Sequence, residues 1–241
     1  MERERLNKFL AECGICSRRE ADRLIEAGRV TVSGQTAQVG AQVEEGQEIL
    51  VDGKPVARKR EKIVLLYHKP VGVVCTERDP HEKRTLSSEV KYPVRVTYAG
   101  RLDKESQGLL ILTNDGDLIE EMMRGANGHE KEYVVRVNKK ITRDFLDRMA
   151  AGIYLKDLGV KTRPCRVEQV GEKTFRIVLT QGLNRQIRRM CSQLNYSIVS
   201  LRRERIVNLQ LGDLKPGELR EATEEEVREL WDCLKIQENE G

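Results

Sequence analysis

The stretch Ala99-Gly100-Arg101-Leu102-Asp103-Lys104-Glu105-Ser106-Gln107-Gly108 runs directly into the apolar segment Leu109-Leu110-Ile111-Leu112. Glycines bound the polar part, and the apolar part has the composition of a buried strand. Loops held by rigid strands often carry catalytic side chains, so Asp103 is the first candidate for chemistry. Taken alone, this spacing is more typical of a solvated turn with a weak surface ion pair. The rest of the chain must decide between the two interpretations.

The composition is that of a charged chain with a basic excess. Its 241 residues suffice for one large domain or two smaller ones. Charged residues make up 34%, aromatic residues 4%, and the formal net charge is +4, so nucleic acid is the first partner to test. No apolar run approaches the roughly 18 residues of a membrane helix, and the N-terminus lacks the apolar core of a signal peptide. We expect a cytoplasmic monomer without a membrane partner.

The cysteines and histidines do not form a recognisable ligand set. A cytosolic chain keeps its six cysteines reduced. Cys13 and Cys16 have the spacing of a metal knuckle, but no second pair lies at a matching distance. The three histidines are dispersed along the chain. We therefore expect no metal and no cofactor.

Two helices and a small sheet are predicted over the first sixty residues. Leu6, Phe9 and Leu10 recur at helical spacing. Ser17-Arg18-Arg19-Glu20 has the form of a capping box that opens a second helix, which Gly28 ends. Two short segments rich in valine and threonine then predict strands, each closed by a turn-forming pair. These strands are expected at Arg29–Val32 and Glu48–Val51, with turns at Ser33-Gly34 and Asp52-Gly53.

The second helix carries a stripe of three arginines, Arg18, Arg19 and Arg23, which is suited to follow a phosphate backbone. The acidic residues between them can instead pair with these arginines on a solvated face. The residues alone leave both interpretations open.

This region resembles an S4-type RNA-binding domain from residue 3 to about residue 50. The segments that carry the resemblance are Arg5-Leu6-Asn7-Lys8-Phe9-Leu10, Ser17-Arg18-Arg19-Glu20-Ala21 and Gly28-Arg29-Val30-Thr31-Val32-Ser33-Gly34. It implies a small α/β module that holds structured RNA through its helix pair, with RNA contacts from the arginine stripe, Arg5 and Lys8. Residues 54–62 are polar and predict a linker. We place one domain at 1–58 and a second at 59–241.

From Ile63 onward, short β-rich runs alternate with helices. This pattern predicts an α+β domain with a largely antiparallel sheet. Residues 77–91 predict a loop with at most one helical turn. The expected strands are Ile63–Tyr67, Val71–Thr76, Val94–Tyr98, Leu109–Thr113, Glu132–Val137, Thr174–Leu179, Ile198–Arg203 and Ile206–Leu211, and the expected helices are Asp117–Met123, Thr142–Ala151, 185–190 and one opened by Thr223-Glu224-Glu225-Glu226.

Arg185, Arg188 and Arg189 lie at the predicted start of a helix, after the turn Gln181-Gly182-Leu183-Asn184. Positive charge at a helix N-terminus opposes the helix dipole. We expect an anion to compensate, either a protein carboxylate or an RNA phosphate. Tyr133, at the head of a predicted strand, is by itself more typical of a core tyrosine.

Three motifs, in matching order and spacing, resemble the pseudouridine synthases of the RsuA and RluB/RluF type, which isomerise uridine in structured RNA. They are Gly100-Arg101-Leu102-Asp103, Lys131-Glu132-Tyr133 and Gln186-Ile187-Arg188. The resemblance implies a catalytic domain built on a mixed, mainly antiparallel sheet flanked by helices. Ser106-Gln107, Glu132 and residues 182–191 are closest to the RluF subgroup. This favours 23S ribosomal RNA as the substrate, with a tRNA hairpin as the alternative.

The resemblance assigns Asp103, Tyr133 and Arg188 to catalysis. A carboxylate can act as nucleophile or charge stabiliser at the sugar, and an arginine can pair with it without losing its own charge. Tyr133 would lie against a uracil flipped out of its stack and move the proton at C5. Arg101, Arg185 and Arg189 are expected to contact RNA. Whether Asp103 attacks the sugar C1′ or the base C6 stays open.

Two other classes of protein compete with this interpretation. A noncatalytic RNA-binding or ribosome-assembly protein would use the same module and basic surface without needing Asp103. A metal-dependent nuclease would need clustered carboxylates or histidines.

Overall fold

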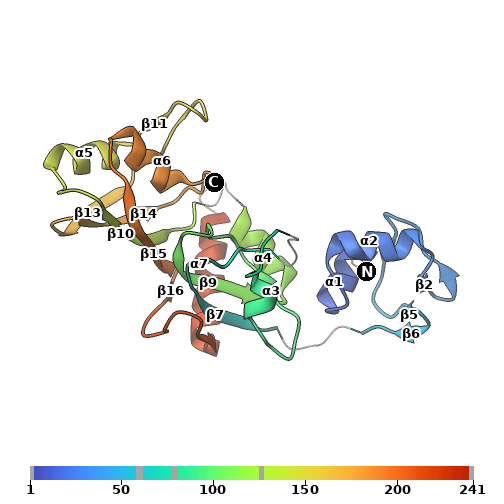
Figure 1. Cartoon of the computed structure of the whole chain (residues 1–241). Coiled ribbons are helices and arrows are strands. Elements are labelled where there is room, and N and C mark those ends of the chain that lie inside the picture. Colours follow the sequence, from blue (N-terminus) through green and yellow to red (C-terminus); the bar gives the residue numbers. More distant parts are fainter. Residues whose placement is uncertain (1–2, 58–61, 77–80, 125–127, 239–241) are drawn as a thin grey trace. The chain divides into compact units, whose positions relative to one another are not determined.

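The computed structural model describes residues 3–57, 62–76, 81–124 and 128–238 (Figure 1). The chain forms two compact units. The first contains the chain up to residue 63 with segments 92–97 and 113–117, and the second contains the remainder. The domain boundary predicted after residue 58 falls on 58–61, outside the described residues. Among the helices of the described ranges, none is both long and apolar enough to cross a membrane.

The first unit contains the predicted pair of helices, α1 (Leu6–Glu12) and α2 (Arg18–Glu26). The Ser17 hydroxyl accepts a hydrogen bond of 3.3 Å from the Glu20 amide, so Ser17 caps α2 as the sequence predicts. The apolar faces of both helices enclose a small core with the strands. Its buried members are Leu6, Leu10, Ala21, Ile25, Val30, Val43, Ile49 and Val51.

A four-stranded sheet completes this unit, with the strand order β3-β2-β5-β6. Ser33-Gly34 and Asp52-Gly53 all have positive φ angles, as tight hairpin turns require, which confirms both predicted turns. Lys54–Pro55 is a strand paired with β5, so the predicted linker was wrong at its first two residues. The strands are β2 (Val30–Val32), β3 (Gln35–Thr36), β5 (Ile49–Val51) and β6 (Lys54–Pro55), with a separate pair β1 (Glu4–Arg5) and β4 (Gln42–Val43).

The second unit is built on the larger sheet, whose main path is β13-β14-β10-β15-β9-β7-β17. The pairs of β10 with β14 and β15 are antiparallel, whereas β9 runs parallel to β15. This confirms the mixed, mainly antiparallel sheet. The strands are β7 (Val64–Lys69), β8 (Thr97–Tyr98), β9 (Gln107–Thr113), β10 (Lys131–Val137), β13 (Arg166–Gly171), β14 (Thr174–Leu179), β15 (Ile198–Ile206), β16 (Leu209–Gln210) and β17 (Leu219–Glu221).

Helices cover this sheet in two groups, each with its own hydrophobic core (Figure 1). One core joins α5 (Arg143–Ala151) and α6 (Gln186–Gln193) to the end of the sheet that contains β10 and β14. The other joins α4 (Gly116–Met123) and α7 (Glu224–Glu238) to β7 and β9. A single-turn helix, α3 (Leu86–Glu89), lies in the segment predicted as a loop with one helical turn. A separate hairpin consists of β11 (Tyr154–Leu155) and β12 (Val160–Lys161).

Four predicted strands need correction. Val71–Thr76, all of which is described, forms no strand and makes only an isolated bridge between Val74 and Thr85. The reason is Lys69, which is fully buried and donates from Nζ to the Pro70 and Val73 carbonyls at 2.9 and 2.8 Å, curling the chain. Val94–Tyr98 is reduced to β8. The two strands predicted over Ile198–Leu211 are a continuous β15 followed by the short β16, because the turn begins at Val207 with φ +53°.

Candidate active site

Asp103 lies on a loop, residues 99–106, that is fixed at both ends. On its N-terminal side the buried Leu102 donates its amide to the Cys75 Sγ at 3.4 Å. On its C-terminal side Gly108 lies opposite Arg203 in the parallel pairing of β9 with β15. Gly108 has φ +112°, and a Cβ there would lie 2.3 Å from the Arg203 carbonyl oxygen, so only glycine permits this approach. The loop therefore has little freedom to shift.

Arg203 holds this loop in place through two hydrogen bonds from its guanidinium. Its side chain is buried, with 2% exposure, and its Nε donates to the Leu109 carbonyl at 2.7 Å. Its Nη1 donates to the Arg101 carbonyl at 3.4 Å. Arg101 lies before Asp103 in the loop and Leu109 lies just after the loop, so one guanidinium binds the backbone on both sides of Asp103. Among the described residues, the remaining nitrogen, Nη2, has no hydrogen-bond partner.

Arg188 connects helix α6 to the Asp103 loop. Its Nη2 donates to the Glu105 carbonyl and the Ser106 hydroxyl, both at 3.1 Å, and its Nε lies 3.7 Å from Asp103 Oδ2. The latter distance is an ion pair and is too long for a hydrogen bond. Arg188 is 18% exposed and Asp103 32%, so the carboxylate is paired but keeps an accessible side.

The neighbouring Arg185 is the N-cap residue of α6 and has the left-handed conformation, with φ +51°. Its Nη1 lies 2.8 Å from the Glu105 carboxylate and 4.0 Å from Asp103 Oδ2. Hydrogen bonding to Arg185 holds the pKa of the Glu105 carboxyl below its usual range. Two protein carboxylates thus supply negative charge beside the helix start, one of the two outcomes that the sequence predicts.

Arg189 lies apart from this group. Its Nε donates to the Asn184 carbonyl at 2.9 Å, and its Nη1 forms an ion pair with Asp157. It is not among the residues that line the cleft beside Asp103. The structure therefore brings Arg185 and Arg188 to Asp103, but not Arg189.

Strand β10 contributes Tyr133 and Lys131 to the same cleft. Tyr133 is half-buried and packs against the core under α5 and α6. Lys131 donates from Nζ to the His129 carbonyl at 3.2 Å, and burial together with the charge of Arg203 lowers its pKa to about 8. Neither Lys131, although it belongs to the tyrosine motif, nor Arg203 has a role predicted from the sequence. The alternation of side chains along a strand, which places Lys131 on the same side as Tyr133, was the available signal for Lys131.

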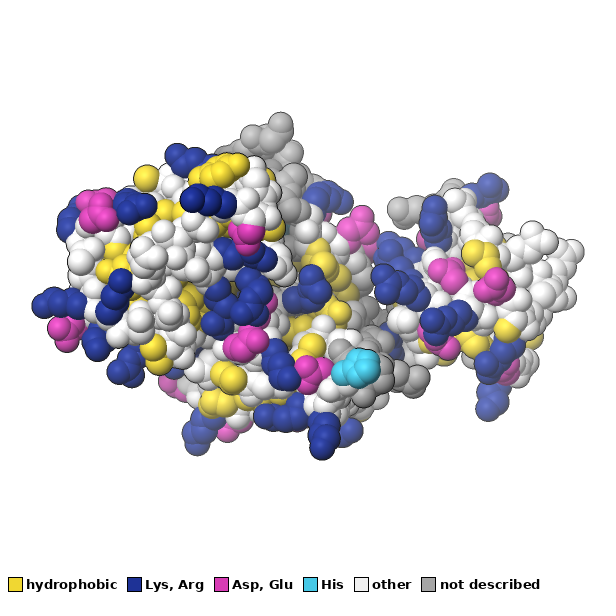
Figure 2. All heavy atoms as spheres, turned by 45° about the horizontal axis from the view of Figure 1, so that its top comes forward, with side chains coloured by type: hydrophobic (Ala, Val, Ile, Leu, Met, Phe, Trp, Pro, Cys, Tyr) yellow, Lys and Arg dark blue, Asp and Glu magenta, His cyan; other side chains and the backbone are white. Residues whose placement is uncertain are grey.

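The cleft has a volume of about 520 Å³, within the range of ligand sites, and lies wholly inside the second unit. Asp103 is the only carboxylate among the described residues that line it. Figure 2 shows Lys and Arg side chains gathered at the middle of the visible face of the larger unit. The basic residues of the lining are Arg101, Lys104, Arg124, Lys131, Arg185, Arg188 and Arg203.

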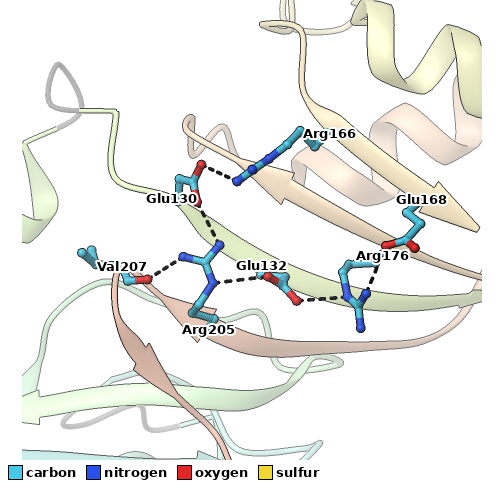
Figure 3. A network of polar contacts seen from close by, with 7 residues as sticks. All are labelled: Glu130, Glu132, Arg166, Glu168, Arg176, Arg205 and Val207. Carbon is cyan, nitrogen blue, oxygen red and sulfur yellow. Dashed lines mark hydrogen bonds and ion pairs between the residues drawn. The ribbon is translucent and has the colours of Figure 1, made fainter. Parts of the chain in front are cut away.

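The opposite side of β10 carries a charge network that we call the polar ladder (Figure 3). Glu132 lies between Arg205 and Arg176, at 3.2 and 3.1 Å. Each arginine also contacts a second carboxylate, and the register pairs Glu132 directly with Arg205. This network ties β10 to its neighbouring strands. Its members are Glu130, Glu132, Arg166, Glu168, Arg176 and Arg205.

In the first unit, the arginine stripe is exposed on α2. Arg23 pairs with Glu20 at 3.2 Å, whereas Arg18 and Arg19 make no ion pair with any described residue. Arg5 is exposed on β1, and Lys8 of α1 donates from Nζ to the Asp117 carboxylate at 2.6 Å and lies 3.7 Å from Glu12. Of the three arginines in the stripe, only Arg23 is therefore paired with an acidic residue of the same helix.

The six cysteines are free thiols. Within the described ranges, no three His, Cys, Asp or Glu residues cluster in a way that could hold a metal ion.

Comparison with known proteins agrees with both units. Residues 63–193 match the RNA pseudouridylate synthase family, and residues 4–49 match the S4 domain. The chain is 45% identical to the dual-specificity RNA pseudouridine synthase RluF of Escherichia coli (strain K12), covering 98% of this chain and 81% of RluF. It is 34% identical to the ribosomal large subunit pseudouridine synthase B of Bacillus subtilis (strain 168), covering 94% of this chain and 95% of that protein.

A crystal structure of a pseudouridylate synthase shares the fold, with a TM-score of 0.70 and 27% identity, over 94% of this chain and 99% of that one. The resemblance found in the three sequence motifs and the S4-like segment is thereby confirmed. A noncatalytic RNA-binding protein does not fit these matches. The chain belongs to the RNA pseudouridylate synthase family and carries an S4 domain ahead of its synthase domain.

Proposed function

We propose that this enzyme converts a specific uridine of 23S ribosomal RNA to pseudouridine, with Asp103 as the reacting carboxylate. The observation that carries the proposal is the cleft, where this one carboxylate lies among seven basic residues. Such a lining attracts a phosphate-bearing substrate, and Asp103 is the one acidic residue among the described residues that line the cleft. The name of the Bacillus subtilis relative supports the ribosomal large subunit as the source of the RNA.

Asp103 performs the central step in this proposal. The reaction breaks the bond from N1 of uracil to C1′ of the ribose and forms a bond from C5 to C1′, while a proton leaves C5 and one is gained at N1. An ionised carboxylate can serve as the nucleophile or stabilise the charge that develops. Arg188 stays positively charged at every working pH, so its ion pair with the Asp103 carboxylate persists. Its Nε stands 3.7 Å away, which leaves the carboxylate an accessible side for the nucleotide.

Tyr133 and Arg101 receive supporting roles. The target base must leave its stack to enter the cleft, at a cost of a few kcal/mol. Tyr133 offers it an aromatic face, and its hydroxyl moves the proton at C5. The Arg101 side chain is exposed and makes no hydrogen bond with any described residue, so it is available to fill the vacated stack or bind a phosphate. Arg185 binds a phosphate beside the helix start.

The S4 domain supplies a second contact to the RNA. Arg18 and Arg19 are exposed and unpaired among the described residues, with Arg5, Lys8 and Arg23 close by in the sequence. We expect the double variant Arg18→Gln/Arg19→Gln to lower the slope of log affinity against log salt by about one to two. Arg23→Gln, which removes an arginine already paired with Glu20, is the matched control and should change the slope less. Filter binding at several salt concentrations measures both slopes.

A tRNA hairpin is the second candidate substrate, and the dual specificity in the name of the Escherichia coli relative favours keeping it. Mapping pseudouridines in 23S RNA and tRNA from three strains separates the candidates. The strains contain the enzyme, lack it, or carry Asp103→Asn in its place. We expect a 23S position to lose pseudouridine in the second and third strains. Loss only in tRNA would overturn the 23S assignment, and a third strain that matches the first would overturn the role of Asp103.

A further inference from the structure

The hairpin of β11 and β12 presents a surface that the cleft does not explain. Tyr154 and Lys161 lie directly opposite each other in its register. Lys156 and Arg163 lie just outside the two strands, and each is exposed next to a buried residue, Leu155 or Thr162, as Tyr154 and Lys161 are. All four side chains are exposed, and Tyr154 is 55% exposed. An aromatic ring among three cations is thus displayed on one small element.

These cations are not neutralised by the protein. Among the described residues, the side chains of Lys156, Lys161 and Arg163 form neither an ion pair nor a hydrogen bond. Asp157, the only acidic residue of the hairpin, is already paired with Arg189. The face therefore has an excess of positive charge that is available to a partner.

The hairpin is built as a fixed element. The buried Thr162 accepts the Ile153 amide on its hydroxyl at 2.9 Å, and its own amide donates to the Ile153 carbonyl at 2.9 Å. Gly152 has φ +85°, and a Cβ there would lie 2.3 Å from the Thr162 carbonyl oxygen. Leu155, on the opposite face from Tyr154, is fully buried in the core under α5 and α6. Tyr154 is thus exposed on a strand whose other face is anchored.

The same hairpin is joined to the cleft. The Arg163 amide donates to the Gln181 side chain at 3.0 Å, and Gln181 is one of the residues that line the cleft. The ion pair of Asp157 with Arg189 ties the hairpin to α6, the helix that also carries Arg188. Figure 1 shows the hairpin extending from the body next to α6. A chain of nucleotides leaving the cleft on this side would meet the hairpin.

We propose that this face, Tyr154, Lys156, Lys161 and Arg163, is a docking surface for the substrate RNA outside the cleft. The cations bind phosphates, and the Tyr154 ring stacks on an unpaired base, which is the usual combination for single-stranded RNA. This inference rests on the enzyme acting on RNA and not on the role proposed for Asp103. A protein or a membrane surface as the partner would leave RNA affinity independent of these residues.

The test compares Tyr154→Ala and the double variant Lys161→Ala/Arg163→Ala with the wild-type enzyme. The substrate is total RNA from cells that lack the enzyme, and the readout is initial rates of pseudouridine formation over a range of RNA and salt concentrations. Lys173→Ala is the matched control, because Lys173 is an exposed lysine at the turn between β13 and β14. Thermal unfolding of each variant verifies that it is folded.

We expect KM to rise about tenfold in each hairpin variant while kcat stays within about twofold. In the double variant, the slope of log KM against log salt should also fall by about one to two. Lys173→Ala should match the wild type in both KM and slope. Wild-type KM and salt slope in both folded hairpin variants would overturn the proposal. Ultraviolet crosslinking of the intact enzyme to the same RNA gives an independent result: a crosslink on Tyr154 supports the surface, and crosslinks confined to other peptides contradict it.

Discussion

The polar ladder and the cleft lie on opposite sides of strand β10 and are built from the same kinds of side chain. In the ladder, three arginines face three glutamates, and every charge has a partner. In the cleft, seven basic residues line the walls beside one carboxylate, and three of the seven, Arg185, Lys104 and Arg124, are paired with glutamates outside the lining, so the basic residues are in excess. A balanced network holds strands together, whereas an unbalanced one attracts an anion. The number of arginines in a region therefore does not indicate whether it binds RNA. The better indicator is whether carboxylates of the protein already neutralise those arginines.

The largest effect that separates the two regions is expected for Arg188→Met. The variant loses the positive charge that pairs with Asp103 and the two hydrogen bonds from α6 to the loop. We expect the single-turnover rate of pseudouridine formation to fall about 10²–10³-fold. Arg166→Met removes an exposed arginine of the ladder and is the control, with a rate expected within about threefold of the wild type. An equal fall in rate in Arg188→Met and Arg166→Met would contradict the difference in function between the cleft and the polar ladder.

The next effect concerns the scaffold under the cleft. In Gly108→Ala, the new Cβ would meet the Arg203 carbonyl oxygen at 2.3 Å in a backbone conformation that alanine rarely adopts. We expect the free energy of unfolding to fall by about 2–4 kcal/mol. Gly100→Ala is matched to it, because Gly100 also has a positive φ but has open space where the Cβ would be. In Gly100→Ala, the free energy of unfolding should fall by only about 1 kcal/mol. Urea unfolding measures the free energy of unfolding of both variants. Similar decreases in the two would contradict the close approach of Gly108 to the Arg203 carbonyl oxygen.

The smallest effect is a pH dependence from Lys131. Its pKa is lowered to about 8, from the usual 10.5, so its charge is lost as the pH rises through about 8. We expect RNA affinity to fall several-fold between about pH 7 and pH 9, and this fall to be absent in Lys131→Met.

The stability of the fold should change in the opposite sense over this range. Because the folded pKa lies below the unfolded one, the unfolded chain binds more protons between about pH 8 and 10.5. Lys131 therefore adds stability as the pH rises, and the loss of affinity cannot be attributed to unfolding. Binding and unfolding measured on the same samples test both signs. An identical decline in the wild type and Lys131→Met would assign the effect to another group.

Local patterns sufficed where the chain obeys local rules. The Asp103 loop with its following strand, the Ser17 cap and the two hairpin turns of the first unit follow from nearby residues. Arg188 and Tyr133 could be selected only through the family resemblance, since spacing alone does not distinguish Arg188 from Arg185 and Arg189. The structure separates the three by their partners.

The sequence was least informative where distant segments meet. Arg203 contacts the Leu109 carbonyl across 94 residues of sequence, through a parallel pairing that no local pattern specifies. Val71–Thr76 has the composition of a strand, but the buried Lys69 donates to the carbonyls of Val73 and the preceding Pro70. Strand β13 is mostly exposed and lacks the apolar alternation that would predict it. In each case a tertiary contact overrides the local signal.

The most direct test compares one carboxylate from each side of β10. Asp103→Asn and Glu132→Gln each replace an arginine-paired carboxylate with its neutral isostere. Both are measured by single-turnover pseudouridine formation and by RNA affinity on the same RNA. We predict that Asp103→Asn binds RNA at least as tightly as the wild type and forms no product, while Glu132→Gln forms product at a rate within about threefold of the wild type. Product formation by Asp103→Asn, or an equal loss in Glu132→Gln, would contradict the assignment of Asp103 as the reacting group.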